Sequence, residues 1–128
     1  MKQVKFFKCN KCGKIIGVIE NQYDTPTICC GDPMEELVPN SSGAAKEKHA
    51  PVIAVDGNTV TVTVGEVEHP MADDHYIMWI YIKTQNGGQR KALKPGDKPQ
   101  ATFALVEGET LEAAYAYCNK HGLWMTEA

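Results

Sequence analysis

The chain is 128 residues long, 43% of its residues are hydrophobic, and its formal net charge is -3 with a pI near 5.8. This length suits one ordinary domain, or one packed core with a small metal-bound module attached. Because basic residues are not in excess, we do not expect nucleic acid as a partner.

The segment 1–8 carries three lysines around Phe6 and Phe7. It has neither the apolar centre of a signal peptide nor a run long enough to span a membrane, so we expect a cytoplasmic protein with no membrane partner. In that reducing compartment five cysteines, an odd number, indicate metal binding or redox chemistry and not a disulfide framework.

Residues 1–37 are predicted to form a small metal-stapled module around four of these cysteines, Cys9, Cys12, Cys29 and Cys30. A C-x-x-C turn presents two thiolates to one ion, and the second pair completes a tetrahedron. Between the pairs we predict a strand and a turn, at Ile15–Ile19 and Tyr23–Pro26. Such a short segment buries little, so the ion would supply part of its folding free energy. Four thiolates suit iron or zinc, and a purely structural zinc site stays open as an alternative.

Residues 38–46 are small and polar and predict a linker to a second domain, residues 47–128. Seven strands are predicted there: Pro51–Asp56, Thr59–Val64, Tyr76–Thr84, Gln89–Leu93, Ala101–Val106, Ala113–Cys118 and Leu123–Thr126. Hairpin turns are predicted at Asp56–Asn58 and Asn86–Gly88. This pattern favours an antiparallel β-sandwich of immunoglobulin-like type, and only Gly108–Ala114 could instead be a helical turn. The fold class is therefore all-β.

The second domain holds all four histidines of the chain and its fifth cysteine: His49, His69, His75, His121 and Cys118. Each falls at a predicted strand end or loop, where a rigid sandwich can bring distant residues together. Imidazole and thiolate are both good ligands for transition metals. A single histidine would be unremarkable at a surface, but the set as a whole indicates one shared metal ion.

These residues lie in motifs that resemble the two-centre superoxide reductases called desulfoferrodoxins. The motifs are Cys9-x-x-Cys12 with Cys29-Cys30, Glu47-Lys48-His49-x-Pro51, His69-Pro70-Met71, His75, Leu93-Lys94-Pro95-Gly96-Asp97 and Cys118-Asn119-x-His121-Gly122-x-Trp124. The resemblance covers essentially the whole chain. The C-terminal motifs are specific, because their order and approximate spacing match across three separated loops.

The resemblance implies two iron ions per chain. One is held by the four cysteines of a desulforedoxin-like module. The other, the catalytic ion, would have His49, His69, His75 and His121 in a plane and Cys118 on the axis. Glu47 matches the carboxylate that takes the sixth position in the oxidised state, and Lys48 matches the cation beside it. The resemblance further implies a homodimer that detoxifies superoxide, with rubredoxin or a similar protein as electron donor.

The chemistry agrees with these residue types. Superoxide takes up one electron and two protons to become hydrogen peroxide. Five protein ligands leave one position open to the anion, and a thiolate opposite pushes electron density toward that position. In a water-exposed site we expect this push to favour release of peroxide over cleavage of the O–O bond.

Two other classes of function stay open. An electron carrier without substrate chemistry explains the four-cysteine centre but leaves five ligands unexplained. A superoxide dismutase would have to be re-reduced by superoxide itself, which a carboxylate-capped ferric ion would resist. The aromatic residues Trp79, Trp124, Tyr76, Tyr81, Tyr115 and Tyr117 are interpreted as packing, not as an electron path. Met71 and Met78 are interpreted as core filling.

Overall fold

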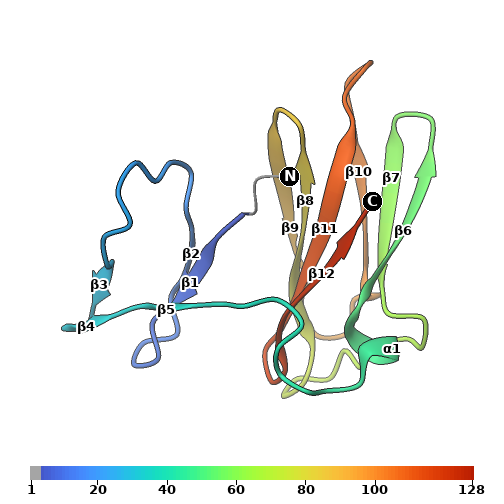
Figure 1. Cartoon of the computed structure of the whole chain (residues 1–128). Coiled ribbons are helices and arrows are strands. Elements are labelled where there is room, and N and C mark those ends of the chain that lie inside the picture. Colours follow the sequence, from blue (N-terminus) through green and yellow to red (C-terminus); the bar gives the residue numbers. More distant parts are fainter. Residues whose placement is uncertain (1–3) are drawn as a thin grey trace. The chain divides into compact units, whose positions relative to one another are not determined.

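A computed structural model describes residues 4–128, which form two compact units with their boundary between Val38 and Pro39 (Figure 1). Apart from one helical turn, all the regular structure is β-strand, which confirms the predicted all-β class. Among the described residues, no helix has the length and apolar character needed to cross a membrane.

The first unit consists of two small antiparallel sheets. Three strands pair in the order β2-β1-β5, namely β2 (Ile15–Gly17), β1 (Phe6–Lys8) and β5 (Glu35–Glu36), and a two-stranded sheet contains β3 (Ile28–Cys29) and β4 (Asp32–Pro33). The buried side chains described in this unit are Phe6, Cys9 and Met34. Three side chains are too few for a self-sufficient core, as expected for a module that depends on an ion.

The strand and the turn predicted between the cysteine pairs are both present, but each is shorter than predicted. The predicted strand from Ile15 ends at Gly17, and Ile19 is 96% exposed, so no sheet face holds its side chain. The predicted turn narrows to a three-residue turn in which the Thr25 amide donates to the Tyr23 carbonyl at 2.9 Å.

The second unit is a sandwich of two antiparallel sheets, which confirms the immunoglobulin-like prediction. The three-stranded sheet has the order β10-β7-β6, with β10 (Gln100–Ala104), β7 (Thr59–Val64) and β6 (Pro51–Asp56). The four-stranded sheet has the order β12-β11-β8-β9, with β12 (Gly122–Glu127), β11 (Leu111–Cys118), β8 (Ile77–Thr84) and β9 (Gly87–Ala92).

Alternating side chains build the core between these sheets. In β7 the three valines of Thr59–Val64 are fully buried, while the intervening threonines are exposed or half-buried. Ile80 and Ile82 of β8 and Phe103 of β10 complete the cluster from both sides. Each apolar side chain buried in this way contributes about 1.5–3 kcal/mol.

All seven strands predicted for this unit are present, and the two from Pro51–Asp56 and Thr59–Val64 have the predicted bounds. The helical alternative for Gly108–Ala114 is wrong, because β11 begins at Leu111 and lies between β8 and β12. The second hairpin turn is at Gln85–Asn86, one residue before its predicted place, because Gly87 already pairs with Thr84.

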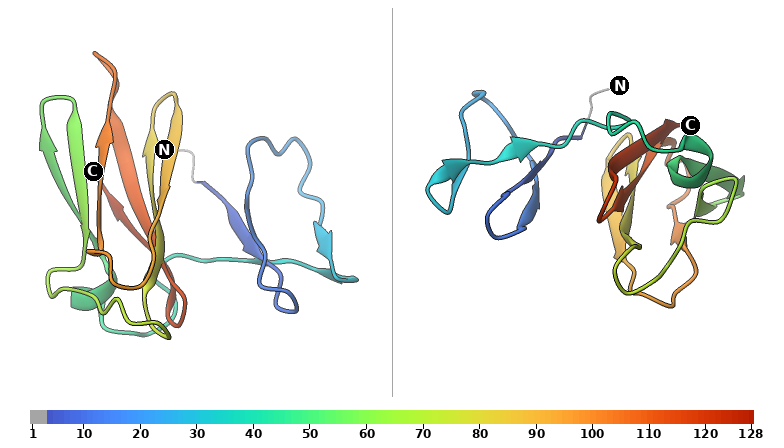
Figure 2. Two further views of the ribbon diagram at one scale, coloured as in Figure 1. Left: turned by 180° about the vertical axis from the view of Figure 1, so that it is seen from behind. Right: turned by 90° about the horizontal axis from the view of Figure 1, so that it is seen from below.

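A short helix, α1 (Lys46–His49), was not predicted. It is a single turn, too short for any 3.6-residue periodicity to show. Helix α1, the β7–β8 connection and the β11–β12 turn all lie at the same end of the sandwich, the lower end in Figure 1 and in the left view of Figure 2. This end therefore gathers segments that are far apart in the sequence.

Candidate metal centres

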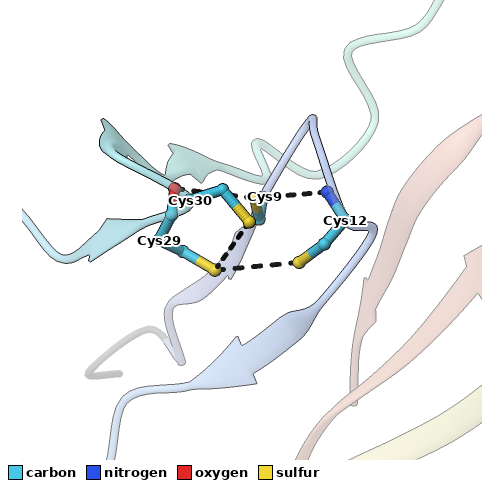
Figure 3. Close-up of side chains that lie close together, drawn as sticks. All are labelled: Cys9, Cys12, Cys29 and Cys30. Carbon is cyan, nitrogen blue, oxygen red and sulfur yellow. Dashed lines mark hydrogen bonds between the residues drawn. The ribbon is translucent and has the colours of Figure 1, made fainter.

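The four cysteines of the first unit converge from two turns. Cys9 and Cys12 lie in the turn after β1, and Cys29 and Cys30 lie where β3 turns into β4 (Figure 3). Cys30 has a φ of 54°, in the left-handed region, which lets two adjacent cysteines face one point. The four sulfur atoms all lie within 4.8 Å of one another.

The sulfur spacing fits a tetrahedral ion. The Sγ atom of Cys29 lies 3.7 Å from that of Cys12 and 4.0 Å from that of Cys30. Four sulfurs at about 2.3 Å from a central ion would be about 3.8 Å apart along each tetrahedral edge. The geometry and the soft donor set thus fit iron or zinc, as the sequence indicated.

The backbone around Cys9 favours its thiolate. The amide of Cys12 donates to the Cys9 sulfur at 3.5 Å, and this contact is the main reason why the pKa of Cys9 falls from 9.0 to about 6. Cys9 is buried, whereas Cys12 and Cys30 are exposed. One side of this centre is therefore open to solvent.

The four histidines of the second unit form a closed ring. His49 belongs to α1, His69 and His75 to the β7–β8 connection, and His121 to the β11–β12 turn. Ring centroids are 4.7 Å apart for His49 and His69, and 4.9 Å apart for His69 and His75. They are 5.1 Å apart for His75 and His121, and 4.8 Å apart for His121 and His49. Neighbouring rings meet at 75–89°, so the four imidazoles surround one common centre.

Hydrogen bonds decide which nitrogen faces that centre. The Nδ1 atoms of His49 and His69 lie 2.7 Å from the carbonyl oxygens of Ala45 and Pro70, which leaves each Nε2 to point inward. The Nε2 atoms of His69 and His75 are buried and have no hydrogen-bond partner among the described residues. Buried nitrogens without partners are costly, and a metal ion would satisfy them.

The inward atoms also have the spacing of metal ligands. His49 Nε2 lies 3.0 Å from His121 Nδ1. Two nitrogens at about 2.1 Å from one ion and at right angles to each other are about 3.0 Å apart. The residues present therefore fit a bound ion on grounds of distance as well as donor type.

Cys118 supplies the sulfur of this centre. It ends β11, is fully buried, and its Sγ lies 3.9 Å from His121 Nδ1. The ligand atoms of His49, His75, Cys118 and His121 all lie within 4.8 Å of one another. His69 is not in that group of four, but its ring contacts the rings of two members of the group, His49 and His75.

Burial favours the neutral form of His49, His69 and His75. Desolvation lowers the pKa of His69 from 6.5 to about 4, and it also lowers the pKa of His49 and of His75. A neutral imidazole has a free lone pair on the nitrogen that faces the centre. These residues are thus in the form that binds a metal ion at neutral pH.

The structure places Glu47 and Lys48 on α1, immediately before His49, and both side chains are exposed. Glu47 lines a surface pocket together with residues that include Pro51, Glu66 and Thr126. These two predicted residues therefore lie on the same helical turn as the ligand His49 and, unlike His49, are exposed.

Trp124 is a site residue that sequence reasoning treated only as packing. It is 4% exposed, stacks on His49 with centroids 5.1 Å apart, and donates from Nε1 to the His121 carbonyl at 3.2 Å. The Trp124 indole thus contacts two of the four histidines that surround the centre. In the sequence, Trp124 was marked by its place at the end of the Cys118–Trp124 motif, three residues after His121, but not by any role.

Asn119 is a second such residue: the sequence showed it only as a member of the Cys118–Trp124 motif, with no role assigned. Its Oδ1 accepts from the Tyr76 amide at 2.9 Å, and its Nδ2 donates to the Asp74 carbonyl at 3.1 Å. These bonds tie the turn that carries His121 to the segment that carries His75. Only the folded structure brings these two segments together.

Comparisons with known proteins agree with this geometry. A model of the Desulfoferrodoxin family matches residues 41–127. A desulfoferrodoxin homolog of Archaeoglobus fulgidus is 42% identical over 123 residues, 96% of each chain, and a desulfoferrodoxin of Syntrophotalea carbinolica is 41% identical over 126 residues, 98% of each.

Solved structures give the same result. The crystal structure of the superoxide reductase from Treponema pallidum matches with a TM-score of 0.84 at 34% identity, covering 98% of this chain and 100% of that one. The superoxide reductase (1Fe-SOR) from Giardia intestinalis matches with a TM-score of 0.56 at 34% identity, covering 65% of this chain and 98% of that one.

Proposed function

Because this chain belongs to the desulfoferrodoxin family, we propose that it is a superoxide reductase, which reduces superoxide to hydrogen peroxide at the histidine and cysteine centre. The observation that carries the proposal is the closed ring of four imidazoles with the Cys118 sulfur beside it. Five such ligands leave one of the six positions of an octahedral ion free for a small anion.

A ferrous ion held by these residues would supply the single electron that superoxide takes up. The residues of the chain do the rest. The Cys118 thiolate donates electron density to the centre, which favours transfer of the electron to substrate. Lys48 carries a positive charge beside the ligand His49 and attracts the anion. Two protons would come from water, which reaches the exposed α1 turn, and we propose that Glu47 would occupy the open position of the centre when substrate is absent.

Two features support a separate role for the first centre. Its four sulfurs suit a one-electron carrier, and the exposure of Cys12 and Cys30 gives a donor protein access to it. We propose rubredoxin or a similar protein as the donor and a homodimer as the assembly, both on the basis of the family. The reducing cytoplasm is the compartment that suits five free thiols.

The products of the reaction test this function against its nearest rival. A superoxide reductase with excess donor should form one molecule of peroxide for each superoxide and release no oxygen. A dismutase forms one peroxide and one oxygen for every two superoxide ions. The measurement is peroxide and oxygen yield under a steady flux of superoxide, and evolution of oxygen at half the superoxide consumed would reject the reductase.

We also propose that residues 47–128 form the superoxide-reducing domain, with residues 1–37 as the four-cysteine module and 38–46 as a linker. Asn40, inside that linker, bonds to β12: its amide donates to the Leu123 carbonyl at 2.9 Å, and its Oδ1 accepts from the Met125 amide at 3.0 Å. A fragment that is meant to fold should therefore begin at Pro39.

The fragment Pro39–Ala128 should fold and react with superoxide at about the rate of the full chain. Its own core and all five ligands of the second centre lie within it. Stopped-flow or pulse-radiolysis kinetics of the reduced fragment give the rate, and the full chain is the control. If the folded, iron-loaded fragment lost the fast reaction, the first centre would be part of the catalytic step.

A further inference from the structure

Gly65 lies directly against the helix that carries His49. It is buried, follows the last residue of β7, and belongs to the connection that leads to His69. A Cβ atom added to Gly65 would lie 2.4 Å from the carbonyl oxygen of Glu47 and 2.7 Å from the carbonyl carbon of Lys48. Both contacts are with backbone, which cannot move aside by a rotamer change. Of the glycines in the described chain, only Gly88 is comparably crowded, and there the neighbour is a tyrosine side chain.

Hydrogen bonds also join the connection that contains Gly65 to α1. The Val67 amide donates to the Glu47 carbonyl at 2.9 Å, so this oxygen is held between Gly65 and Val67. The His69 amide in turn donates to the Val64 carbonyl at 3.1 Å. The connection that carries one ligand is therefore packed and bonded to the helical turn that carries another.

Hydrogen bonds within α1 couple the Glu47–Lys48 peptide to His49. The Lys48 amide donates to the Ala45 carbonyl at 3.3 Å, the Ala50 amide donates to the Lys46 carbonyl at 2.8 Å, and His49 Nδ1 bonds to the Ala45 carbonyl. A displacement of the Glu47–Lys48 peptide thus carries the His49 ring with it.

We propose that Gly65 is a positioning residue for His49. Because Gly65 has no side chain, α1 can approach closely enough for His49 to complete the group of four imidazoles around the metal centre. Ordinary contacts of a Cβ begin at 3.4 Å, so a methyl group at Gly65 would displace the Glu47 carbonyl by about 1 Å. Metal ligands tolerate deviations of only about 0.2 Å. The displacement is therefore large enough to loosen or detach this one ligand. The inference rests on the second metal centre of the proposed function.

The test compares Gly65→Ala with Gly87→Ala in the full chain. Gly87 is a matched control, since a Cβ there would meet nothing within 4 Å and its φ is not in the left-handed region. The first measurement is the concentration of a competing chelator that removes half of the ferrous ion from the second centre. The second is the position of the thiolate-to-iron absorption band of the loaded, oxidised centre.

We expect Gly65→Ala to bind this ion at least about tenfold more weakly than the wild type and to show a shifted band. The four-cysteine centre should be unchanged and so serves as an internal reference. Gly87→Ala should match the wild type in both measurements. A variant that only destabilised the sandwich would keep the wild-type band in its loaded fraction, so an unshifted band or an unchanged affinity in Gly65→Ala would overturn the proposal.

Two further outcomes are decisive. If Gly65→Ala does not fold, Val67→Pro is the second variant: its ring carbon replaces the amide hydrogen that the Glu47 carbonyl accepts, so it removes this bond and crowds α1 from the same connection. It should also weaken binding of the ion and shift the band, and wild-type values would overturn the proposal. If the wild type binds the ion but does not reduce superoxide, the proposed function fails and the role of Gly65 is still decided by affinity. A wild type that binds no ion at this centre overturns both.

Discussion

Replacing Cys118 with serine should abolish superoxide reduction and leave the four-cysteine centre intact. Cys118 is fully buried, and its Sγ lies 3.9 Å from His121 Nδ1. A serine hydroxyl is a harder and far less basic donor than a thiolate, so the electron density that favours transfer to the substrate is lost. Since changes outside the ligand set already cost about 10–100-fold in activity, loss of a ligand should cost at least about 100-fold.

The visible spectrum separates this effect from unfolding. Cys118→Ser should lose the thiolate-to-iron band of the oxidised second centre while the band of the first centre stays. Cys9→Ser is the matched control, because it also exchanges one sulfur for oxygen but in the first centre. It should lose the first band and keep the fast reaction with superoxide. If Cys118→Ser kept both its second band and its rate, Cys118 would not be a ligand.

Replacing Lys48 with methionine should slow the reaction of the ferrous protein with superoxide about tenfold and flatten its dependence on salt. The net charge of the chain is -3, so its average field repels an anion. Lys48 is exposed beside His49, and in the described part of the chain it forms no ion pair that would neutralise it. Its charge can act within the Debye length, about 10 Å at 0.1 M salt.

Two neighbours on α1 provide the controls for Lys48. Lys46→Met removes the same charge two residues away, on another side of the helical turn, and should have a much smaller effect. Glu47→Ala should leave the rate nearly unchanged, because the sixth position must be open in the reduced protein, and should alter the spectrum of the oxidised protein. Pulse radiolysis over a range of ionic strengths gives the rates. An unchanged rate and salt slope in Lys48→Met would exclude electrostatic steering by this residue.

Strand bounds were predicted correctly where buried apolar residues alternate with more exposed polar residues along the strand. The valines of Thr59–Val64 repeat with period two, and the structure gives the strand those bounds. The strand β11 was harder to delimit, because six consecutive residues from Ala113 to Cys118 are buried and such a run has no alternation. Its first residues, next to Gly108, could therefore be taken for a helical turn.

Ligand positions could be predicted from the sequence because their chemistry marks them. Histidine and cysteine are scarce, and the motifs around His49 and Cys118 have specific spacing. The residues that support the ligands, such as Gly65 and Trp124, are not metal-binding residue types, so their role could not be predicted in this way. Gly65 matters because of a backbone that lies far away in the sequence, and Trp124 matters because its ring happens to stack on His49. Such contacts exist only in the folded chain, so the motif that contains Trp124 marked its position but not its role, and no motif contained Gly65.

Iron and zinc content per chain, measured together with the visible spectrum of the purified protein, tests the two-iron assignment most directly. The two ligand groups predict two iron atoms per chain. They also predict a red colour from the four-cysteine centre and, after oxidation, an additional thiolate-to-iron band near the red end of the spectrum. A colourless protein with one zinc ion per chain would contradict both the metal assignment and the superoxide chemistry that depends on it.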